Sequence, residues 1–196
     1  AIPYIPHRLT EGYGLKMAAL ENLCRQGVSL VITVDCGITA LSQVRKAKRI
    51  GLDIIITDHH TPLSEIPPAV AVVDPKLPDS NYTFPELAGV GVALKLLQAL
   101  LQGVGKEGQL DELIDLVALG TVADMMPLLG ENRYLVKEGL ELINTNPRLG
   151  IREMIAQTRL DIGSVDAGGI SWVIAPRLNA AGRLAHALTS YKLLMT

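Results

Sequence analysis

The stretch Asp53-Ile54-Ile55-Ile56-Thr57-Asp58-His59-His60 joins an apolar run to three side chains that can bind a metal ion or move a proton. An earlier apolar run, Leu30–Val34, ends in the same way at Asp35. Short runs of β-branched residues predict buried strands, and parallel strands bring their carboxyl ends to one edge of a sheet, where open sheets bind ligands. We therefore expect Asp35 to lie beside the three side chains that follow Thr57.

The segment between these two runs has the pattern of a crossover helix. Apolar residues recur every three positions from residue 38 to residue 50, basic residues occupy the other side, and Gly51 follows. A preceding helix is predicted over 15–26, and a third apolar run over 69–73 also ends in an acid, Asp74. These patterns predict an α/β fold with a mostly parallel sheet flanked by helices.

The chain changes character after a Pro-rich stretch, residues 75–85, which is predicted to be a loop. Helical spacing of apolar residues predicts further helices over 87–101, 110–124, 131–143, 148–157 and 184–195. We expect two regions: an α/β core over residues 1–126 and a helical connecting region over residues 127–196.

The composition limits the class of protein. The chain has 196 residues, of which 48% are hydrophobic, so it can bury one core and a small second lobe. Its formal net charge of −2 gives no overall attraction to an anionic partner, which must then be held by local Lys and Arg groups or by metal ions. Cys24 and Cys36 lack the spacing of a zinc site or disulfide framework, which favours the cytoplasm. We expect no secretory leader, because no charged segment precedes an apolar stretch and a cleavage site, and no membrane partner, because no apolar run reaches about 18 residues.

Asp124 is the candidate ligand outside the sheet. It shares a helical face with Leu113, so we expect it to point inward, where a charge is costly unless paired or bound to a metal. Asp115 falls off that face and is expected to be solvated. Asp35, His59 and Asp124 form a mixed carboxylate and imidazole set suited to manganese or another divalent ion. Each acid taken alone is more often a turn residue or a helix cap.

Asp58 and His60 complete the predicted site. Asp58, beside His59, is expected to accept a hydrogen bond that fixes the tautomer of the His59 imidazole. His60 is then expected to face a substrate phosphate. A pair of divalent ions bridged by a carboxylate is the usual apparatus for phosphoryl hydrolysis, because the ions activate water and neutralise developing charge.

Several segments of the chain resemble successive motifs of the DHH phosphoesterase superfamily, and they occur in the order of that family. The segments are VDCGI with Asp35, ITDHH with Asp58-His59-His60, LAGVGVALKL from Leu87, ALGTVADMMPL with Asp124, and PRLNAAGRL from Pro176. The resemblance covers essentially the whole chain. Within the superfamily it is strongest to the bacterial exonucleases specific for single-stranded DNA.

The resemblance implies a function and a role for each residue. It implies 5′ to 3′ hydrolysis of single-stranded DNA in repair and recombination, with Mn²⁺ or Mg²⁺ in a two-ion site, and a repair helicase or single-strand binding protein as partner. Asp35 would bridge the ions, His59 and Asp124 would be ligands, and His60 would contact phosphate. The residues that would line the DNA path are Arg177, Asn179, Ala180, Gly182 and Arg183.

The chain also departs from the family pattern. The first family motif, an Asp-x-Asp pair, and the Gly-rich His motif of the C-terminal domain have no counterpart here. The chain opens without an initiator Met, so we expect an excised piece of a longer nuclease that is weak or inactive alone. Two alternatives stay open: a relative that acts on short oligonucleotides, cyclic dinucleotides or pyrophosphate, and a non-catalytic binding module of a repair assembly.

Overall fold

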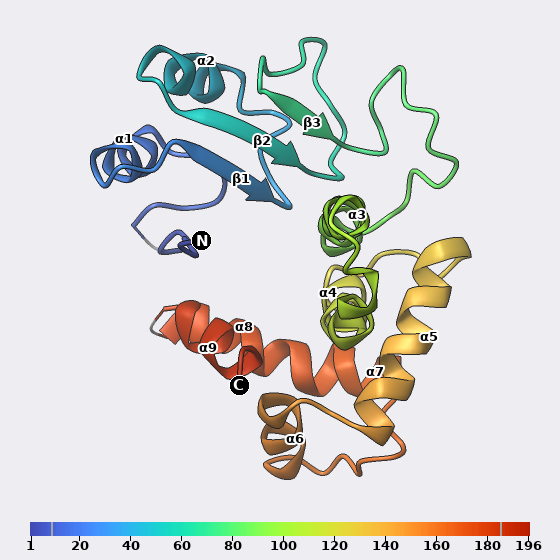
Figure 1. The fold of residues 1–196 in the computed structure, drawn as a ribbon. Helices are drawn as coiled ribbons and strands as arrows, with labels where there is room; N and C mark the ends of the chain where they lie inside the picture. Colours follow the sequence, from blue (N-terminus) through green and yellow to red (C-terminus); the bar gives the residue numbers. More distant parts are fainter. Residues whose placement is uncertain (9, 185) are drawn as a thin grey trace. The chain divides into compact units, whose positions relative to one another are not determined.

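A parallel sheet forms in the first half of the chain, where strand and helix patterns alternate (Figure 1). The structure is a computed structural model, and it describes residues 1–8, 10–184 and 186–196. Within these residues the sheet consists of β1 (Leu30–Val34), β2 (Asp53–Thr57) and β3 (Ala71–Val73), hydrogen-bonded in that order. The predicted α/β fold with a parallel sheet flanked by helices is therefore confirmed.

One face of the sheet is covered by helices α1 (Met17–Arg25) and α2 (Leu41–Arg49), and α2 is the predicted crossover between β1 and β2. The buried side chains beneath them are aliphatic: Leu20, Val44, Ala47, Leu52, Ile54 and Ile56. The opposite face of β1 is open, because its alternate side chains Leu30, Ile32 and Val34 are 45%, 45% and 54% exposed.

Helix α3 (Gly89–Gly103) lies at the carboxyl ends of the strands. Figure 1 shows the arrowheads of β1 and β2 directed toward it, and it packs against both strands. The 3₁₀ turn η1 (Glu107–Gln109) follows it. This arrangement brings the first residues of α3 to the edge of the sheet at which β1 and β2 end.

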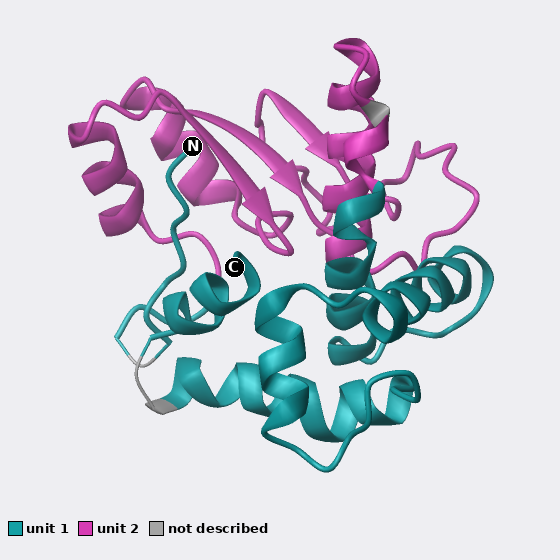
Figure 2. Cartoon of the chain, turned by 60° about the horizontal axis from the view of Figure 1, so that its bottom comes forward, with its two compact units in different colours: residues 1–13, 111–196 teal, residues 14–110 magenta. Residues whose placement is uncertain are grey.

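Packing divides the described chain into two compact units (Figure 2). Unit 2, Gly14–Leu110, contains the sheet and α1 to α3. Unit 1 joins Ala1–Tyr13 to Asp111–Thr196 and is helical. The expected boundary between a core and a connecting region at residue 126 stays a prediction.

Unit 1 is built from short and medium helices around an aliphatic core. Its helical elements are η2 (Asp111–Leu113), α4 (Ile114–Ala123), α5 (Gly130–Thr145), α6 (Leu149–Ala156), α7 (Ala167–Gly169), the π-helical turn η3 (Ile170–Ile174), α8 (Ala175–Leu184) and α9 (Leu188–Leu194). Residues of α4, α5, α6 and η3 supply the core. In the part of the chain that the structure describes, every helix is too short or too polar to span a bilayer.

The expectation that Asp115 is solvated is wrong. Asp115 is 1% exposed and binds Arg148 through two hydrogen bonds of 2.6 Å, one from Nε and one from Nη2. The same guanidinium donates to the carbonyl oxygens of Glu112 and Leu194, so it links η2, α4 and α9. Helical spacing could not predict this pair, because the partner lies 33 residues further along the chain.

The segment PRLNAAGRL is helical, which the sequence patterns did not predict. Pro176 has no N–H to donate to the carbonyl of Trp172, four residues before, and its ring would clash there in a regular α-helix. The wider π-helical turn of η3 occupies this position, so α7, η3 and α8 run on as one helical rod (residues 167–184).

Candidate metal centre

A tight turn after β1 positions Asp35. Its backbone N–H donates to the carbonyl of Thr57 at 3.0 Å, which continues the pairing of β1 with β2 by one residue. Asp35 has φ of +60°, a left-handed conformation that aspartate tolerates better than most residues. Gly37 has φ of +116°, and a Cβ there would lie 3.0 Å from Thr33 Oγ1. The turn therefore holds the Asp35 side chain at the edge of the sheet.

Asp58 is the structural centre of the site. It is 1% exposed, and its backbone N–H donates to the carbonyl of Val73. Its Oδ2 accepts from the Ile38 N–H at 2.9 Å, and its Oδ1 accepts from the His59 N–H at 2.8 Å and the His60 N–H at 3.3 Å. Burial raises the pKa of Asp58, but hydrogen bonds from Ile38, the His60 ring and the two histidine N–H groups outweigh it and leave the pKa below its ordinary value. Asp58 is therefore an anion that orders the turn.

Asp58 is expected to contact the ring of His59, but in the structure it contacts the ring of His60. The His60 Nδ1 lies 2.7 Å from Asp58 Oδ1, so this nitrogen carries the proton and the lone pair of a neutral ring is on Nε2. A carboxylate behind a histidine in this way is the usual support of a metal-binding or phosphate-binding imidazole. The predicted orienting role of Asp58 thus applies to His60 in the structure.

The structure brings Asp35, His59 and His60 together. His59 Nε2 lies 3.0 Å from Asp35 Oδ1, and the His59 and His60 rings pack edge to face at 4.6 Å. One donor atom from each of the three residues lies within 4.8 Å of the others. His59 is nearly buried, whereas the side chains of His60 and Asp35 are about half exposed. A carboxylate with two imidazoles in this space fits a divalent first-row ion that is open to solvent on one side.

The first residue of α3 touches Asp35. A Cβ built on Gly89 would lie 2.4 Å from Asp35 Oδ1 and 2.8 Å from Asp35 Cβ and Cγ. Only glycine allows the start of this helix to come so close. The positive end of the helix dipole then faces the carboxylate and stabilises its charge. The segment LAGVGVALKL therefore contributes a close approach of backbone to an acid, which spacing alone did not indicate.

Asp74 is a feature of the site that the sequence reasoning missed. It follows β3 directly, is 5% exposed, and accepts the Lys76 N–H on Oδ1 at 2.8 Å. Its Oδ2 is buried and has no hydrogen-bond partner among the described residues. Burial and the negative charge of Asp58 raise the pKa of Asp74, while His59 is close enough to lower it. The signal was present, because the apolar run 69–73 ends in an acid as the first two runs do.

Asp124 and the arginine segment belong to unit 1. Asp124 follows the last residue of α4 as its C-cap, and its side chain is exposed, so the expected inward direction is wrong. Arg177, Asn179 and Arg183 are exposed on α8, and Gly182 is half-buried. The predicted roles of these residues stay predictions.

Comparison with known proteins identifies one family along most of the chain. A model described as the N-terminal domain of the DHH family matches residues 1–121. The single-stranded-DNA-specific exonucleases RecJ of Bacillus subtilis, Thermus thermophilus and Escherichia coli are 48%, 43% and 39% identical in sequence to this chain. The alignments cover 98%, 99% and 92% of this chain but 24%, 28% and 33% of those relatives. The chain therefore spans a quarter to a third of their length.

Two solved structures are similar to the chain. A crystal structure of exonuclease RecJ bound to manganese matches with a TM-score of 0.85 and 41% identity, over 99% of this chain and 49% of that one. RecJ of Thermus thermophilus in complex with Mn²⁺ matches with a TM-score of 0.79 and 38% identity, over 92% of this chain and 27% of that one. Both comparison proteins hold the metal that the donor set of Asp35, His59 and His60 suits.

Proposed function

Because this chain belongs to the DHH family, we propose that it carries the core of a metal-dependent exonuclease that degrades single-stranded DNA from its 5′ end. The observation that carries the proposal is the gathering of Asp35, His59 and His60 where the parallel strands end. The preference for single strands is supported by the similar proteins of Bacillus subtilis and Thermus thermophilus, which are single-stranded-DNA-specific exonucleases. The 5′ to 3′ direction rests on the motif resemblance.

We assign Asp35 and His59 as ligands of Mn²⁺ or Mg²⁺, with Asp124 as a further carboxylate ligand. The support is the mixed oxygen and nitrogen donor set and the Mn²⁺ bound by the two similar structures. When bound, the ions supply an activated water and neutralise charge on the phosphate. The protein fixes the ligands beforehand, since Asp35 is held by its turn and by the start of α3.

His60 and the arginine segment bind the substrate in this proposal. Asp58 holds the His60 ring through Nδ1, so that Nε2 is the atom available to a phosphate oxygen. The half-exposed position of His60, against the buried position of His59, supports this division of roles. Arg177 and Arg183 carry guanidinium groups that match phosphate oxygens, with Asn179 and Gly182 between them.

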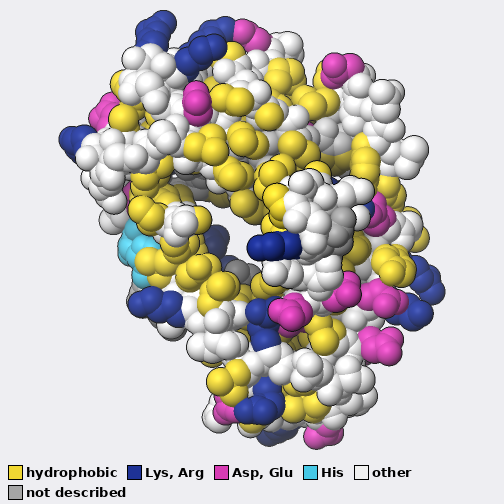
Figure 3. Space-filling model, viewed as in Figure 1, with side chains coloured by type: hydrophobic (Ala, Val, Ile, Leu, Met, Phe, Trp, Pro, Cys, Tyr) yellow, Lys and Arg dark blue, Asp and Glu magenta, His cyan; other side chains and the backbone are white. Residues whose placement is uncertain are grey.

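The setting of the enzyme follows from the same resemblance. We propose that it acts in the cytoplasm in DNA repair and recombination, with a helicase or a single-strand binding protein as partner. Figure 3 shows basic side chains dispersed among acidic and hydrophobic ones, which accords with the net charge of −2. DNA would then be held at a few local sites and not by a general positive field.

The test compares this chain and the longest product of its gene on 5′-labelled single-stranded and duplex DNA with Mn²⁺. We expect the longer product to release nucleotides from the single strand, and its His59→Ala variant to lose both Mn²⁺ affinity and hydrolysis. The matched control is His186→Ala, because His186 packs against His7 in unit 1 and lies outside the proposed ligand set.

Two results would replace this proposal. Faster hydrolysis of dinucleotides, cyclic dinucleotides or pyrophosphate than of long strands would assign the same ligands to another branch of the family. DNA binding without hydrolysis, unchanged by His59→Ala, would indicate a non-catalytic binding module.

A further inference from the structure

Unit 1 contains a hollow lined by two arginines from separate segments. It has a volume of about 380 Å³ and lies between the loop after α6 and the helical rod, and its lining residues are Gln157, Thr158, Arg159, Val173 and Arg177. This volume falls within the range of small-ligand sites. Among the described residues no carboxylate forms an ion pair with Arg159 or Arg177, so the hollow offers cationic donors to an anion.

The loop that carries Arg159 is held in place before any ligand binds. The side chain of Asn144 on α5 accepts the N–H groups of Gly163 and Val165 and donates to the carbonyl of Val165. At the start of the loop, Thr158 Oγ1 donates to the carbonyl of Ile155 and accepts the N–H of Leu160. On the other wall, Arg177 Nη1 donates to the carbonyl of Val173 at 2.9 Å. Both walls are therefore preorganised.

Trp172 directly precedes the part of the rod that lines this hollow. It is 82% exposed, adjoins the lining residue Val173, and is the only tryptophan of the chain. A single exposed apolar side chain is common and needs no explanation by itself. Here, however, Trp172 adjoins in the sequence a hollow with two guanidinium groups, and the flanking exposed residues of the rod are Gly168, Pro176 and Arg177. Such a surface does not suit an apolar protein partner.

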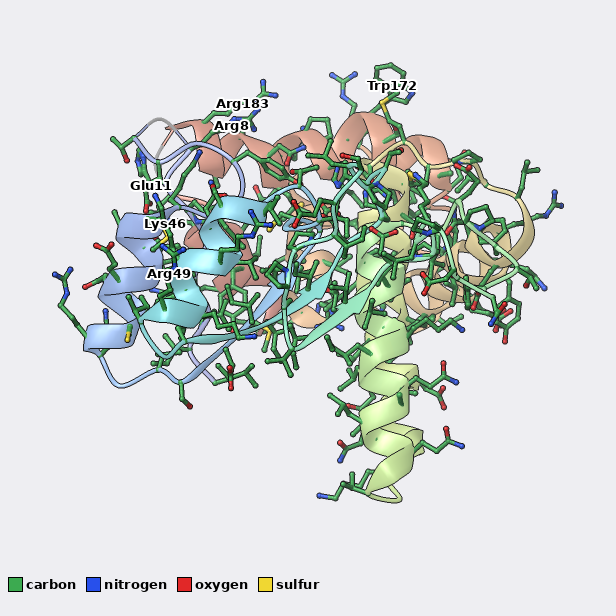
Figure 4. The ribbon with its side chains drawn as sticks, turned by 90° about the horizontal axis from the view of Figure 1, so that it is seen from above. Arg8, Glu11, Lys46, Arg49, Trp172 and Arg183 are labelled. Atoms are coloured by element: carbon green, nitrogen blue, oxygen red, sulfur yellow. The ribbon has the colours of Figure 1, made fainter. Side chains whose placement is uncertain are left out.

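The same face of the rod continues to the predicted DNA-lining residues. Trp172, Pro176, Asn179 and Arg183 follow one another at helical spacing and are all exposed. Figure 4 shows Trp172 and Arg183 projecting from the same side of the rod. At 1.5 Å per residue they are separated by about 16 Å along the axis. The indole and the terminal guanidinium therefore lie on one exposed face of the rod, and Val173 and Arg177, which line the hollow, lie on the neighbouring face.

We propose that Trp172 and the hollow of Arg159 and Arg177 form a subsite for one nucleotide of single-stranded DNA. The base stacks on the indole, the adjoining phosphate binds the two guanidinium groups, and the strand continues toward Arg183. The proposal rests on the proposed function for its ligand. Stacking contributes about 1–3 kcal/mol per base with any sequence, whereas the internal base pairs of a duplex have both faces covered by their neighbours and cannot stack on an indole. The subsite thus favours single strands.

The experiment uses the chain without divalent ions, so that neither hydrolysis nor the metal site takes part. An oligothymidylate of about 12 nucleotides, within the usual site size of single-strand binders, is titrated while the emission of Trp172 is followed. We expect saturable quenching by the single strand and little by a duplex. Affinities of variants are measured by the anisotropy of a labelled oligonucleotide.

The variants separate stacking from charge. Trp172→Ala should weaken binding by about 5- to 150-fold, and Trp172→Phe should restore most of it. Arg159→Ala should lower the slope of log affinity against log salt by about 0.7, the value for one phosphate of a single strand. The control is Tyr134→Ala, which removes a 61% exposed aromatic side chain of α5 and should leave affinity unchanged. An abasic strand of equal length should bind Trp172→Ala and the native chain alike.

Three results would overturn the subsite: binding without a change in Trp172 emission, equal quenching by duplex and single strand, or no binding at low salt. Each can occur while the longer gene product still hydrolyses DNA, so the failure of the subsite is distinct from that of the nuclease. Stacking on Trp172 in a protein that never hydrolyses DNA would support the subsite and refute the proposed function.

Discussion

Replacing Gly89 with alanine should displace Asp35 and weaken metal binding. The added Cβ would lie 2.4 Å from Asp35 Oδ1, and ordinary contact begins near 3.4 Å, so the carboxylate would have to retreat by about 1 Å. The distance between a metal ion and its ligand tolerates only about 0.2 Å. We therefore expect the affinity for Mn²⁺ to fall at least about tenfold, or about 1.4 kcal/mol, as when a group supporting a ligand is lost.

The effect on folding should be smaller, because two contributions oppose each other. Crowding a packed site costs about 1–3 kcal/mol, whereas alanine is favoured over glycine in a helix by up to about 1 kcal/mol. The matched control is Gly91→Ala, two residues further along the same helix. Its Cβ would meet Leu87 Cδ1 at 2.7 Å, a clash of similar severity with a buried aliphatic side chain. That variant should lose stability and keep its metal affinity.

The assay is a titration with Mn²⁺ followed by the electron paramagnetic resonance of the free ion, alongside urea unfolding of both variants in EDTA. Unchanged Mn²⁺ affinity in Gly89→Ala would refute the argument that the start of α3 sets the position of Asp35. An equal loss of affinity in Gly91→Ala would also refute it, since the effect would then come from α3 as a whole.

Three further predictions concern the buried groups of the two units. Arg148→Ala should lower the free energy of unfolding, measured in urea, by about 3–5 kcal/mol, because it leaves the Asp115 carboxylate buried without its partner. The control Arg152→Ala breaks an exposed ion pair and should lower the free energy of unfolding by less than about 1 kcal/mol. Burial raises the pKa of Asp74. The stability that the protonated Asp74 side chain contributes is therefore fully present below the unfolded pKa of about 3.9, and it is lost as pH rises through the folded pKa. Asp74→Asn should raise the unfolding free energy measured at neutral pH in EDTA and leave it unchanged in strong acid. Burial raises the pKa of Cys36 from 9.0 to about 11, so its native thiol should react with a thiol reagent about 100-fold more slowly at pH 8 than in urea, and equal rates would contradict the burial.

The strands and the gathering of acids at their ends could be predicted, because both depend on local pattern. The run Asp53–Thr57 is a strand over the residues expected, and the crossover helix differs from its predicted range only at the ends. Parallel pairing then requires that Asp35 and His59 meet at one edge, whatever the remaining structure is.

Directions of single side chains could not be predicted, because they depend on partners far along the chain or on the exact path of a turn. Asp115 is buried only because Arg148 reaches it. Asp58 orients His60 only because the turn after β2 brings the His60 ring back to the Asp58 carboxylate. The helix through Pro176 depends on a π-helical turn, which no periodicity of 3.6 residues indicates.

The folding stability of unit 2 depends on whether the open face of β1 is covered. Parallel sheets are normally buried on both sides, yet Leu30, Ile32 and Val34 remain about half exposed. Covering them would contribute roughly 2–4 kcal/mol, half of the full transfer free energy of three such side chains. Any layer that binds there favours the folded sheet, and so does a metal ion held at the end of the same strand. Binding of a covering layer and binding of the metal ion are therefore thermodynamically linked through the folding of β1. Each should raise the apparent affinity of unit 2 for the other wherever folding of unit 2 is incomplete.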